Sequence, residues 1–463
     1  MINGLKVKLL NVKADRELIT NQNLLKAILC LSIPIIINNF IQTMYNLTDA
    51  YWLGRIGTES VAAITLVSPV QNVIIQFGQG ISLAGSVLIS QYYGAKDNKN
   101  AGDMANHVFI CSMLFSLAAA FICFVATAFI VGWLGAEGDL ADSAQVYLKI
   151  VVLDMPFLFL INLYSAVNQA QGNTVTPMLL NFLGIVLNMI LDPLLMFGLN
   201  LGIAGAALAT LSAKIPPAVI ALLGLVNRNK TIHIDFKGFV FKKDKLKAIV
   251  KVGLPTALGG STMQFGFLLI TKNVLKYGGA ATAAYGIGNR INGIITLPST
   301  AVGSATATIV GQNIGAKKRD RAEEAYKLAR LISVIFLFIC GMILSRTFVN
   351  TPIVKFFSDD DEVIAMASKF ISIMAFWCFT NGVYNSTTGL FQGSGHTWVN
   401  MAVDASRLWI FRFATIWFCE NILHMREQSI WYAVVVSNGI SAALLYLAYK
   451  AGLWKKDVIQ KED

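Results

Sequence analysis

The sequence predicts an all-α integral membrane protein with twelve transmembrane helices, arranged as two parallel repeats of six helices. Three observations predict this class: the composition, the length of the apolar runs, and a match between the two halves of the chain. Of the 463 residues, 55% are hydrophobic and only 14% are charged, whereas soluble proteins carry about 25% charged residues. Most of the chain is therefore expected to lie in a lipid bilayer.

Twelve apolar runs are long enough to cross a bilayer, which takes about 20 residues in a helix. Unbroken runs of this length favour helices, because the strands of a membrane barrel alternate in polarity and are only about ten residues long. The expected spans are 27–53, 60–93, 103–134, 140–171, 175–199, 202–227, 247–276, 281–313, 320–350, 361–392, 397–420 and 428–453.

Basic residues collect in alternate connections, which indicates how the chain crosses the membrane. One set of connections holds Lys96 and Lys99, the loop 228–246 and the stretch 317–321, whereas acids mark the opposite set, as at 359–362. The positive-inside rule places the basic set in the cytoplasm. We therefore expect a multi-pass protein of the cell (inner or plasma) membrane with both termini cytoplasmic. The net charge of +11 follows from this topology, so no nucleic-acid partner is expected.

The two halves of the chain match each other on either side of the basic loop. With a shift of 221 residues Pro34 aligns with Pro255, Gly57 with Gly278, and Gly94–Ala95–Lys96 with Gly315–Ala316–Lys317. Because each half has an even number of spans, the repeats run parallel, as in several transporter architectures. The expected organisation is a cytoplasmic segment 1–26, an N-lobe 27–227, a cytoplasmic linker 228–246, a C-lobe 247–453 and a cytoplasmic tail 454–463.

Two isolated carboxylates mark a candidate ion site. Asp49 and Asp192 are the only acids in the first and fifth runs, and a carboxylate inside a span is functional by default. Tyr45 and Asn188 each precede one of these acids by four residues, which places each pair on one helix face. Thr210, in the sixth run, lies at a similar depth. At 1.5 Å per residue, Asp49, Asp192 and Thr210 all lie within roughly 6–12 Å of the outer surface. Such oxygens suit a hard cation, and two desolvated acids close together can instead hold a proton.

Each of these residues also has a purely structural interpretation. Asp49 can be an interfacial residue near a helix end, and Asp192 a turn residue before a proline. Tyr45 can be a packing or anchoring residue, and Asn188 and Thr210 can form hydrogen bonds between helices.

Further residues are candidates for a substrate cavity. They are Gln42, Asp154, Met155, Met189 and Gln264. Gln42 lies on the helix face of Tyr45, and Asp154 is an acid in the middle of its span. The two methionines are included because thioethers adapt to varied ligands. Asp154 is expected either to join the cavity or to pair with a neighbour such as Asn162 or Tyr45. Pro34 is expected to kink the first helix. In span eleven Asp404 and Arg407 are three residues apart, so they are expected to pair.

Longer stretches resemble the multidrug and toxic compound extrusion (MATE) family. They are the early proline of span one followed by TDAYWLGRIGTESVAA, then LISQYYGAKD, GNTVTPMLLNFLGIVLNMILDPLL, GIAGAALAT and, in the second half, IVGQNIGAKKRDRAEEA. The resemblance implies two six-helix lobes around a central cleft, and antiport of organic cations and other amphipathic drugs against Na⁺ or H⁺. One group of the family has an N-lobe ion site whose residues match Tyr45, Asp49, Asn188, Asp192 and Thr210.

The second lobe departs from the family pattern that another group shows. Where that group has a glutamate in span seven, this chain has Met263 and Gln264, and span ten has no acid in its interior. The ion site is therefore expected in the first lobe alone.

The leading hypothesis is a secondary active multidrug efflux transporter that works by alternating access and antiport with Na⁺ or H⁺. The alternative is a lipid-linked saccharide flippase of a related fold, which should line its cleft with bases, whereas the first-lobe spans hold acids and almost no buried base. An enzyme is not expected, because the spans show no clustered His, Cys and acid.

The six cysteines have no paired spacing, so free thiols are expected. No cofactor is expected, nor a metal other than Na⁺ at Asp49 and Asp192. The expected partners are small organic compounds and membrane lipids, with a functional monomer.

Overall fold

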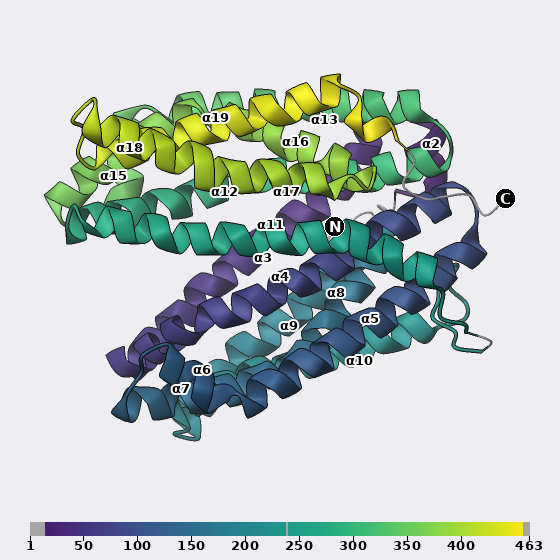
Figure 1. Ribbon diagram of the computed structural model, residues 1–463. Coiled ribbons are helices and arrows are strands. Elements are labelled where there is room, and N and C mark those ends of the chain that lie inside the picture. Colours follow the sequence, from purple (N-terminus) through teal and green to yellow (C-terminus); the bar gives the residue numbers. More distant parts are fainter. Residues whose placement is uncertain (1–13, 238, 457–463) are drawn as a thin grey trace, which may run out of the picture. The chain divides into compact units, whose positions relative to one another are not determined.

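The structure is a computed structural model that describes residues 14–237 and 239–456, with the backbone alone at positions 47, 50 and 58. Every regular element in this part of the chain is a helix (Figure 1). The expected all-α class is thus confirmed. Long apolar runs form helices here because a helix satisfies all of its backbone hydrogen bonds internally, as a bilayer requires.

The chain divides into two compact units. The first unit contains residues 33–257 and a short N-terminal piece that ends at Ile19, and the second contains Thr20–Ser32 and the chain from Leu258 onward. One of the three divisions falls inside the short helix α2 (Arg16–Asn21). The other two fall inside long helices, α3 (Leu24–Ile56) and α11 (Lys243–Leu275), beside the prolines Pro34 and Pro255. These two helices occupy equivalent places in the two halves.

The remaining helices follow in the order that the apolar runs predict. In the first unit they are α4 (Thr58–Gly94), α5 (Asn98–Val125), α6 (Thr127–Trp133), α7 (Gly138–Val151), η1 (Val152–Asp154), α8 (Met155–Ala170), α9 (Val175–Pro193), η2 (Leu194–Gly198) and α10 (Gly202–Val226). In the second unit they are α12 (Gly279–Gly315), α13 (Arg319–Leu344), α14 (Thr347–Lys355), α15 (Asp361–Phe376), α16 (Phe379–Gly393), α17 (Thr397–Ala405), η3 (Ser406–Arg412), α18 (Phe413–Asn421), α19 (Gln428–Lys450) and η4 (Leu453–Lys455).

The backbone confirms the internal repeat. Helices α4 and α12 each have 37 residues and begin 221 positions apart. Each ends in a turn with a lysine in the left-handed region, Lys96 (φ 63°) and Lys317 (φ 61°). Each is preceded by a glycine with positive φ, Gly57 and Gly278, where a side chain would be strained. The residues that align in the sequence therefore hold equivalent turns.

Nine helices of the described chain are long and apolar enough to cross a membrane, or ten when the bent pair α15 and α16 is taken as one span. The two other expected spans are helical but less apolar or interrupted. Helix α11 carries several lysines, and the span 397–420 is interrupted by the π-helix η3 between α17 and α18. Two spans are shorter than expected, because α5 ends at Val125 and α13 at Leu344 and short helices follow each of them.

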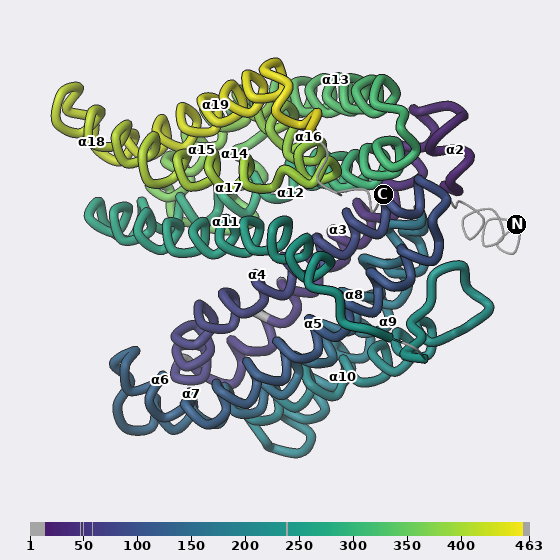
Figure 2. The backbone as a smooth tube through the Cα atoms, turned by 45° about the vertical axis from the view of Figure 1, so that its right-hand side comes forward, coloured from purple at the N-terminus to yellow at the C-terminus, as the bar shows by residue number. Residues whose placement is uncertain are grey.

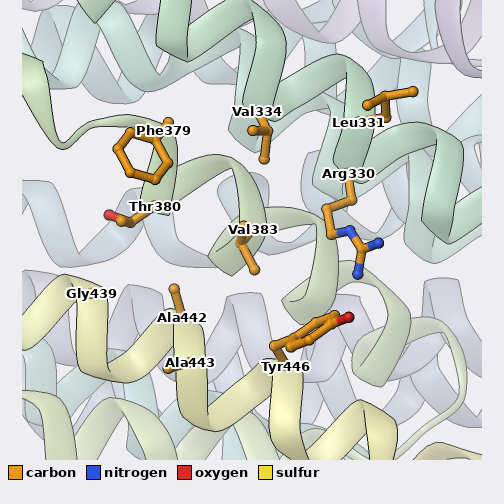
Figure 3. A pocket seen from close by; sticks show the side chains of 10 residues that line it. All are labelled: Arg330, Leu331, Val334, Phe379, Thr380, Val383, Gly439, Ala442, Ala443 and Tyr446. Carbon is orange, nitrogen blue, oxygen red and sulfur yellow. The ribbon is translucent and has the colours of Figure 1, made fainter.

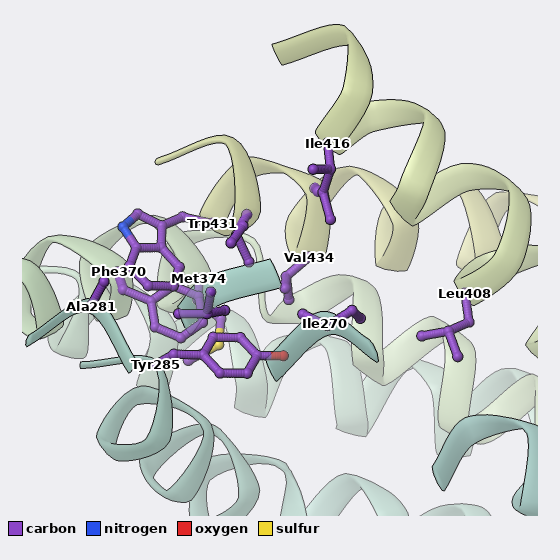
Figure 4. Close-up of a cluster of buried hydrophobic side chains, with 12 residues drawn as sticks. Ile270, Ala281, Tyr285, Phe370, Met374, Leu408, Ile416, Trp431 and Val434 are labelled. Atoms are coloured by element: carbon purple, nitrogen blue, oxygen red, sulfur yellow. The ribbon is translucent and has the colours of Figure 1, made fainter. Parts of the chain in front are cut away.

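An aromatic stack holds together the helices at one end of the second unit (Figure 4). Phe370 of α15 lies 4.4 Å from the ring of Trp431 of α19, and Tyr285 of α12 stacks on both at 5.8 and 6.0 Å. Pairs of this kind each contribute about 0.5–1.5 kcal/mol beyond the burial of their area. Gly288 allows the close approach, since a Cβ there would lie 2.2 Å from the ring of Phe370.

The basic linker between α10 and α11 packs against the start of α5, within the first unit. Figure 2 follows this linker from the end of α10 to the start of α11. The Asn106 side chain donates to the Asp235 carbonyl (2.8 Å) and accepts from its N–H (3.1 Å). The buried His107 ring accepts the N–H of Lys242 (2.9 Å), and Lys245 pairs with Asp103 at 2.5 Å. The linker is thus an ordered part of the first unit.

Candidate cation-binding site

The most buried part of the candidate site is the last turn of α9. The Asn188 amide donates a hydrogen bond of 2.9 Å to one carboxylate oxygen of Asp192. The two residues are only 4% and 1% exposed. The spacing of four residues places both side chains on one helix face, as the sequence predicts. Pro193 follows and the chain continues as the π-helix η2, a rare conformation that often occurs at functional sites.

Helices α3 and α10 bring the other predicted residues to the same place. The carboxylates of Asp49 and Asp192 lie close enough to interact electrostatically. The Tyr45 hydroxyl interacts electrostatically with both acids, and the Thr210 side chain lies beside it. Thr210 also donates to the Ala206 carbonyl one turn earlier, at 3.1 Å. The structure therefore gathers all five predicted residues, from three helices of the first unit, into one cluster.

Two oxygens of this cluster have no hydrogen-bond partner although both are buried. They are the side-chain carbonyl oxygen of Asn188 and the second carboxylate oxygen of Asp192. A buried acceptor without a partner is unfavourable by about 1–3 kcal/mol. Both atoms are acceptors, so a hard cation or a proton would satisfy them. Within the described ranges, no group of three or more His, Cys, Asp or Glu side chains is placed to hold a metal ion, so Na⁺ would rely here on neutral oxygens as well.

The sequence interpretation missed Tyr147 of α7, which belongs to the same cluster. This side chain interacts electrostatically with Asp49, Asp154 and Asp192. The sequence does contain an indication of this contact. Tyr147 precedes Asp154 by seven residues, or two helical turns, so the two side chains share one face of the same predicted span. Tyr147 thus connects the pair Asp49 and Asp192 with Asp154, a further acid of the first unit that is buried.

Asp154 does pair with a neighbour, one of the two expectations, but the partner is Lys214 and not Asn162 or Tyr45. Asp154 is 3% exposed and accepts a hydrogen bond from the Lys214 ammonium group, whose side chain is 26% exposed. The second carboxylate oxygen of Asp154 has no partner. Lys214 was overlooked because it lies in the apolar run 202–227, although it follows Thr210 by four residues and so shares its helix face.

Among the residues predicted for a substrate cavity, Met155 is a core residue. It is 1% exposed and packs with Phe159 and Ala120 in the core of the first unit, because the turn η1 directs it inward at the start of α8. Met189 is 40% exposed on α9, and the exposed Gln42 donates to Asn46 (3.2 Å) on α3.

The second unit carries a different group of buried charges. Gln264 lies half-buried on α11 there, beside Met263. The predicted pair of Asp404 and Arg407 is confirmed at 3.5 Å. The Tyr384 hydroxyl also donates to Asp404, and the Arg407 guanidinium lies 4.5 Å above the ring of Tyr384. The single acid is thus already engaged by an arginine and a tyrosine, which favours a structural network over a cation site.

Comparison with known proteins gives consistent matches over nearly the whole chain. The family model described as MatE matches residues 34–194 and 255–418. The chain is 24% identical over 440 residues to "Probable multidrug resistance protein YoeA" of Bacillus subtilis, which covers 93% of this chain and 94% of that protein. It is 25% identical to "Multidrug export protein MepA" of Staphylococcus haemolyticus, over 92% of this chain and 94% of that protein.

Solved structures match the fold with similar coverage. A MOP superfamily transporter from Pyrococcus furiosus aligns with a TM-score of 0.89 at 23% identity, over 95% of this chain and 98% of the other. An outward-facing multidrug resistance MATE family transporter aligns with a TM-score of 0.88 at 23% identity, over 97% and 98%. At this identity the likeness establishes the fold alone.

Proposed function

The chain belongs to the MatE family of membrane transporters, and from this premise we propose that it exports amphipathic or cationic organic compounds by antiport with Na⁺ or H⁺. The observation that carries the proposal is the pair of unpartnered buried oxygens on Asn188 and Asp192, next to the carboxylate of Asp49. A transporter driven by an ion gradient needs a buried site that gains a cation or a proton and loses it again, and these atoms supply one.

We assign roles to the residues of the cluster as follows. Asp49 and Asp192 provide the charge that binds the cation or proton. Asn188 orients Asp192 through its hydrogen bond, and Tyr45 and Thr210 supply neutral oxygens. An ion that binds here from one side stabilises one state of the transporter, and the organic compound stabilises the other. Exchange then follows if each ligand has different affinities for the two states.

The charge of the cluster is unfavourable for the alternative function, a lipid-linked saccharide flippase. With every group ionised, three acids (Asp49, Asp154 and Asp192) and one base (Lys214) give a net charge of −2, since −3 + 1 = −2. Lys214 is also already paired with Asp154. Such a cluster attracts cations and repels the anionic headgroup that a flippase would carry.

We expect both termini and the linker 228–246 to lie in the cytoplasm. The lobes 27–227 and 247–453 are expected to cross the membrane. Single cysteines at Lys237 and Asp360 are expected to react with a membrane-impermeant thiol reagent from opposite sides, because the linker is basic and the connection at 359–362 is acidic. The measurement is labelling of intact cells against inverted vesicles, in a variant without the six native cysteines. Labelling of both positions from one side would refute the orientation.

The asymmetry between the halves gives a further prediction. Asp404→Asn is expected to change stability or compound preference but to leave the ion dependence of efflux in place, since Asp404 is engaged by Arg407 and Tyr384. Gln264→Ala is expected to behave in the same way. The test is the efflux rate of a cationic dye against Na⁺ concentration and pH. Loss of that dependence in Asp404→Asn would show that the second unit takes part in coupling.

A further inference from the structure

The second unit has a groove between α13, α16 and α19 (Figure 3). Its volume is about 430 Å³, and its walls are mostly apolar: Leu331 and Val334 from α13, Phe379 and Val383 from α16, Ala442 and Ala443 from α19. Leu331 is 55% exposed and Ala443 is exposed as well, so the groove opens on the surface of the unit.

A single arginine lies at one end of this groove, opposite Phe379 at the other end (Figure 3). The Arg330 guanidinium lies 5.2 Å from the ring of Tyr326 and 4.9 Å from that of Tyr446, and it donates to the Tyr326 hydroxyl at 3.3 Å. In the described chain no carboxylate forms an ion pair with Arg330; the nearby Glu323 pairs with Lys327 and Lys455 instead. The two tyrosines thus orient a cation that still has N–H groups free for an anion, because a guanidinium has five such donors.

Arg330 lies within the expected span 320–350, in its cytoplasmic half, and a long basic side chain at such a position can extend to the headgroup level of a bilayer. It is the last charged residue of α13 before the uncharged run 331–344, which spans about 21 Å at 1.5 Å per residue. Tyr446 and Lys450 lie at the same end of the unit, since the ring of Tyr449 of α19 lies 4.6 Å from that of Tyr326 of α13. The Lys450 ammonium is 5.8 Å from the Tyr446 ring. Arginine, lysine and tyrosine together are typical of a membrane interface.

We propose that this groove binds a phospholipid with an anionic headgroup. The phosphate pairs with Arg330 and Lys450 at the interface, and one acyl chain lies along the apolar walls toward Phe379. Charge complementarity favours this occupant, because an arginine recognises phosphate through paired N–H groups. A groove that is charged at one end and apolar along its length matches the amphipathic form of a lipid.

Native mass spectrometry of the full chain, purified in detergent with equal amounts of phosphatidylglycerol and phosphatidylcholine, tests the proposal. Wild-type protein is expected to retain phosphatidylglycerol preferentially. Arg330→Gln is expected to lower that preference by roughly fivefold, as the removal of one interfacial base implies. Arg330→Lys is expected to recover part of it. Arg346→Gln, which removes an exposed arginine just beyond the other end of α13, is the matched control and should behave like wild type.

A second variant tests the acyl part of the site without altering charge. Ala443→Phe fills the groove and is expected to reduce the retained lipid, whereas Val436→Phe, at a 40% exposed position of α19 outside the groove, should not. The proposal is overturned if wild type shows no preference between the two lipids, or if Arg346→Gln lowers the preference as much as Arg330→Gln. It is also overturned if Ala443→Phe removes a bound second copy of the chain rather than lipid.

Discussion

Asp192→Asn is expected to abolish efflux while the protein still folds and inserts into the membrane. The substitution keeps the shape of the side chain and its contact with Asn188, but it removes the charge from the most buried position of the cluster. Without that charge the ion can no longer favour one state of the transporter. Because couplings between two ligands are typically ~1–3 kcal/mol, active efflux should fall by roughly tenfold or more. The measurement is export of a fluorescent cationic dye from cells that lack their own exporters.

Asp49→Asn is expected to give the same loss, since its carboxylate interacts with that of Asp192. The matched control is Asp139→Asn, which removes an exposed acid near the start of α7 and should leave efflux unchanged. Membrane-inserted amounts of all three variants are compared with wild type. If Asp49→Asn and Asp192→Asn both export dye at the wild-type rate, the two acids are structural and the proposed coupling site is wrong.

The largest loss of stability is expected from Lys214→Met. This change removes the one ion-pair partner that Asp154 has among the described residues; Asp154 is 3% exposed and already has one unsatisfied oxygen. An uncompensated buried charge lowers the free energy of unfolding by about 3 kcal/mol or more. The measurement is the denaturation midpoint of purified protein in detergent, followed by the recovery of monodisperse protein after heating.

The double variant Asp154→Asn/Lys214→Met distinguishes an unpaired charge from a general packing effect. It removes both charges and is expected to recover most of the lost stability, because no buried charge remains without a partner. Lys149→Met, at an exposed lysine of α7, is the control and should have little effect. If the double variant is as unstable as Lys214→Met alone, the ion pair is not the source of the loss.

The fold and the five residues of the candidate cation site were predictable from helix length, helix spacing and the depth of polar residues in the apolar runs. Apolar runs of span length give helices, and a spacing of four residues places Asn188 beside Asp192 wherever the helix lies. The internal repeat independently supports the prediction of two equivalent halves, since aligned residues such as Lys96 and Lys317 hold the same left-handed turn.

The contacts that the sequence did not predict depend on tertiary packing or on local departures from the helix. Asp154 and Lys214 are 60 residues apart in the chain, so their pairing depends on how α10 packs near the turn η1. That turn also directs Met155 into the core, although the adaptable thioether had suggested a cavity residue. The π-helix η3 interrupts span eleven without any proline or glycine within it to predict the irregularity.

Transport by purified protein in liposomes tests most directly the claim that ion coupling lies in the cluster of the first unit. Uptake of a cationic dye is measured with a Na⁺ gradient and a pH gradient imposed separately, for wild type, Asp192→Asn and Asp404→Asn. Wild type and Asp404→Asn are expected to respond to at least one of the gradients, and Asp192→Asn to neither. Gradient-driven uptake by Asp192→Asn at the wild-type rate, or its loss in Asp404→Asn alone, would contradict the account.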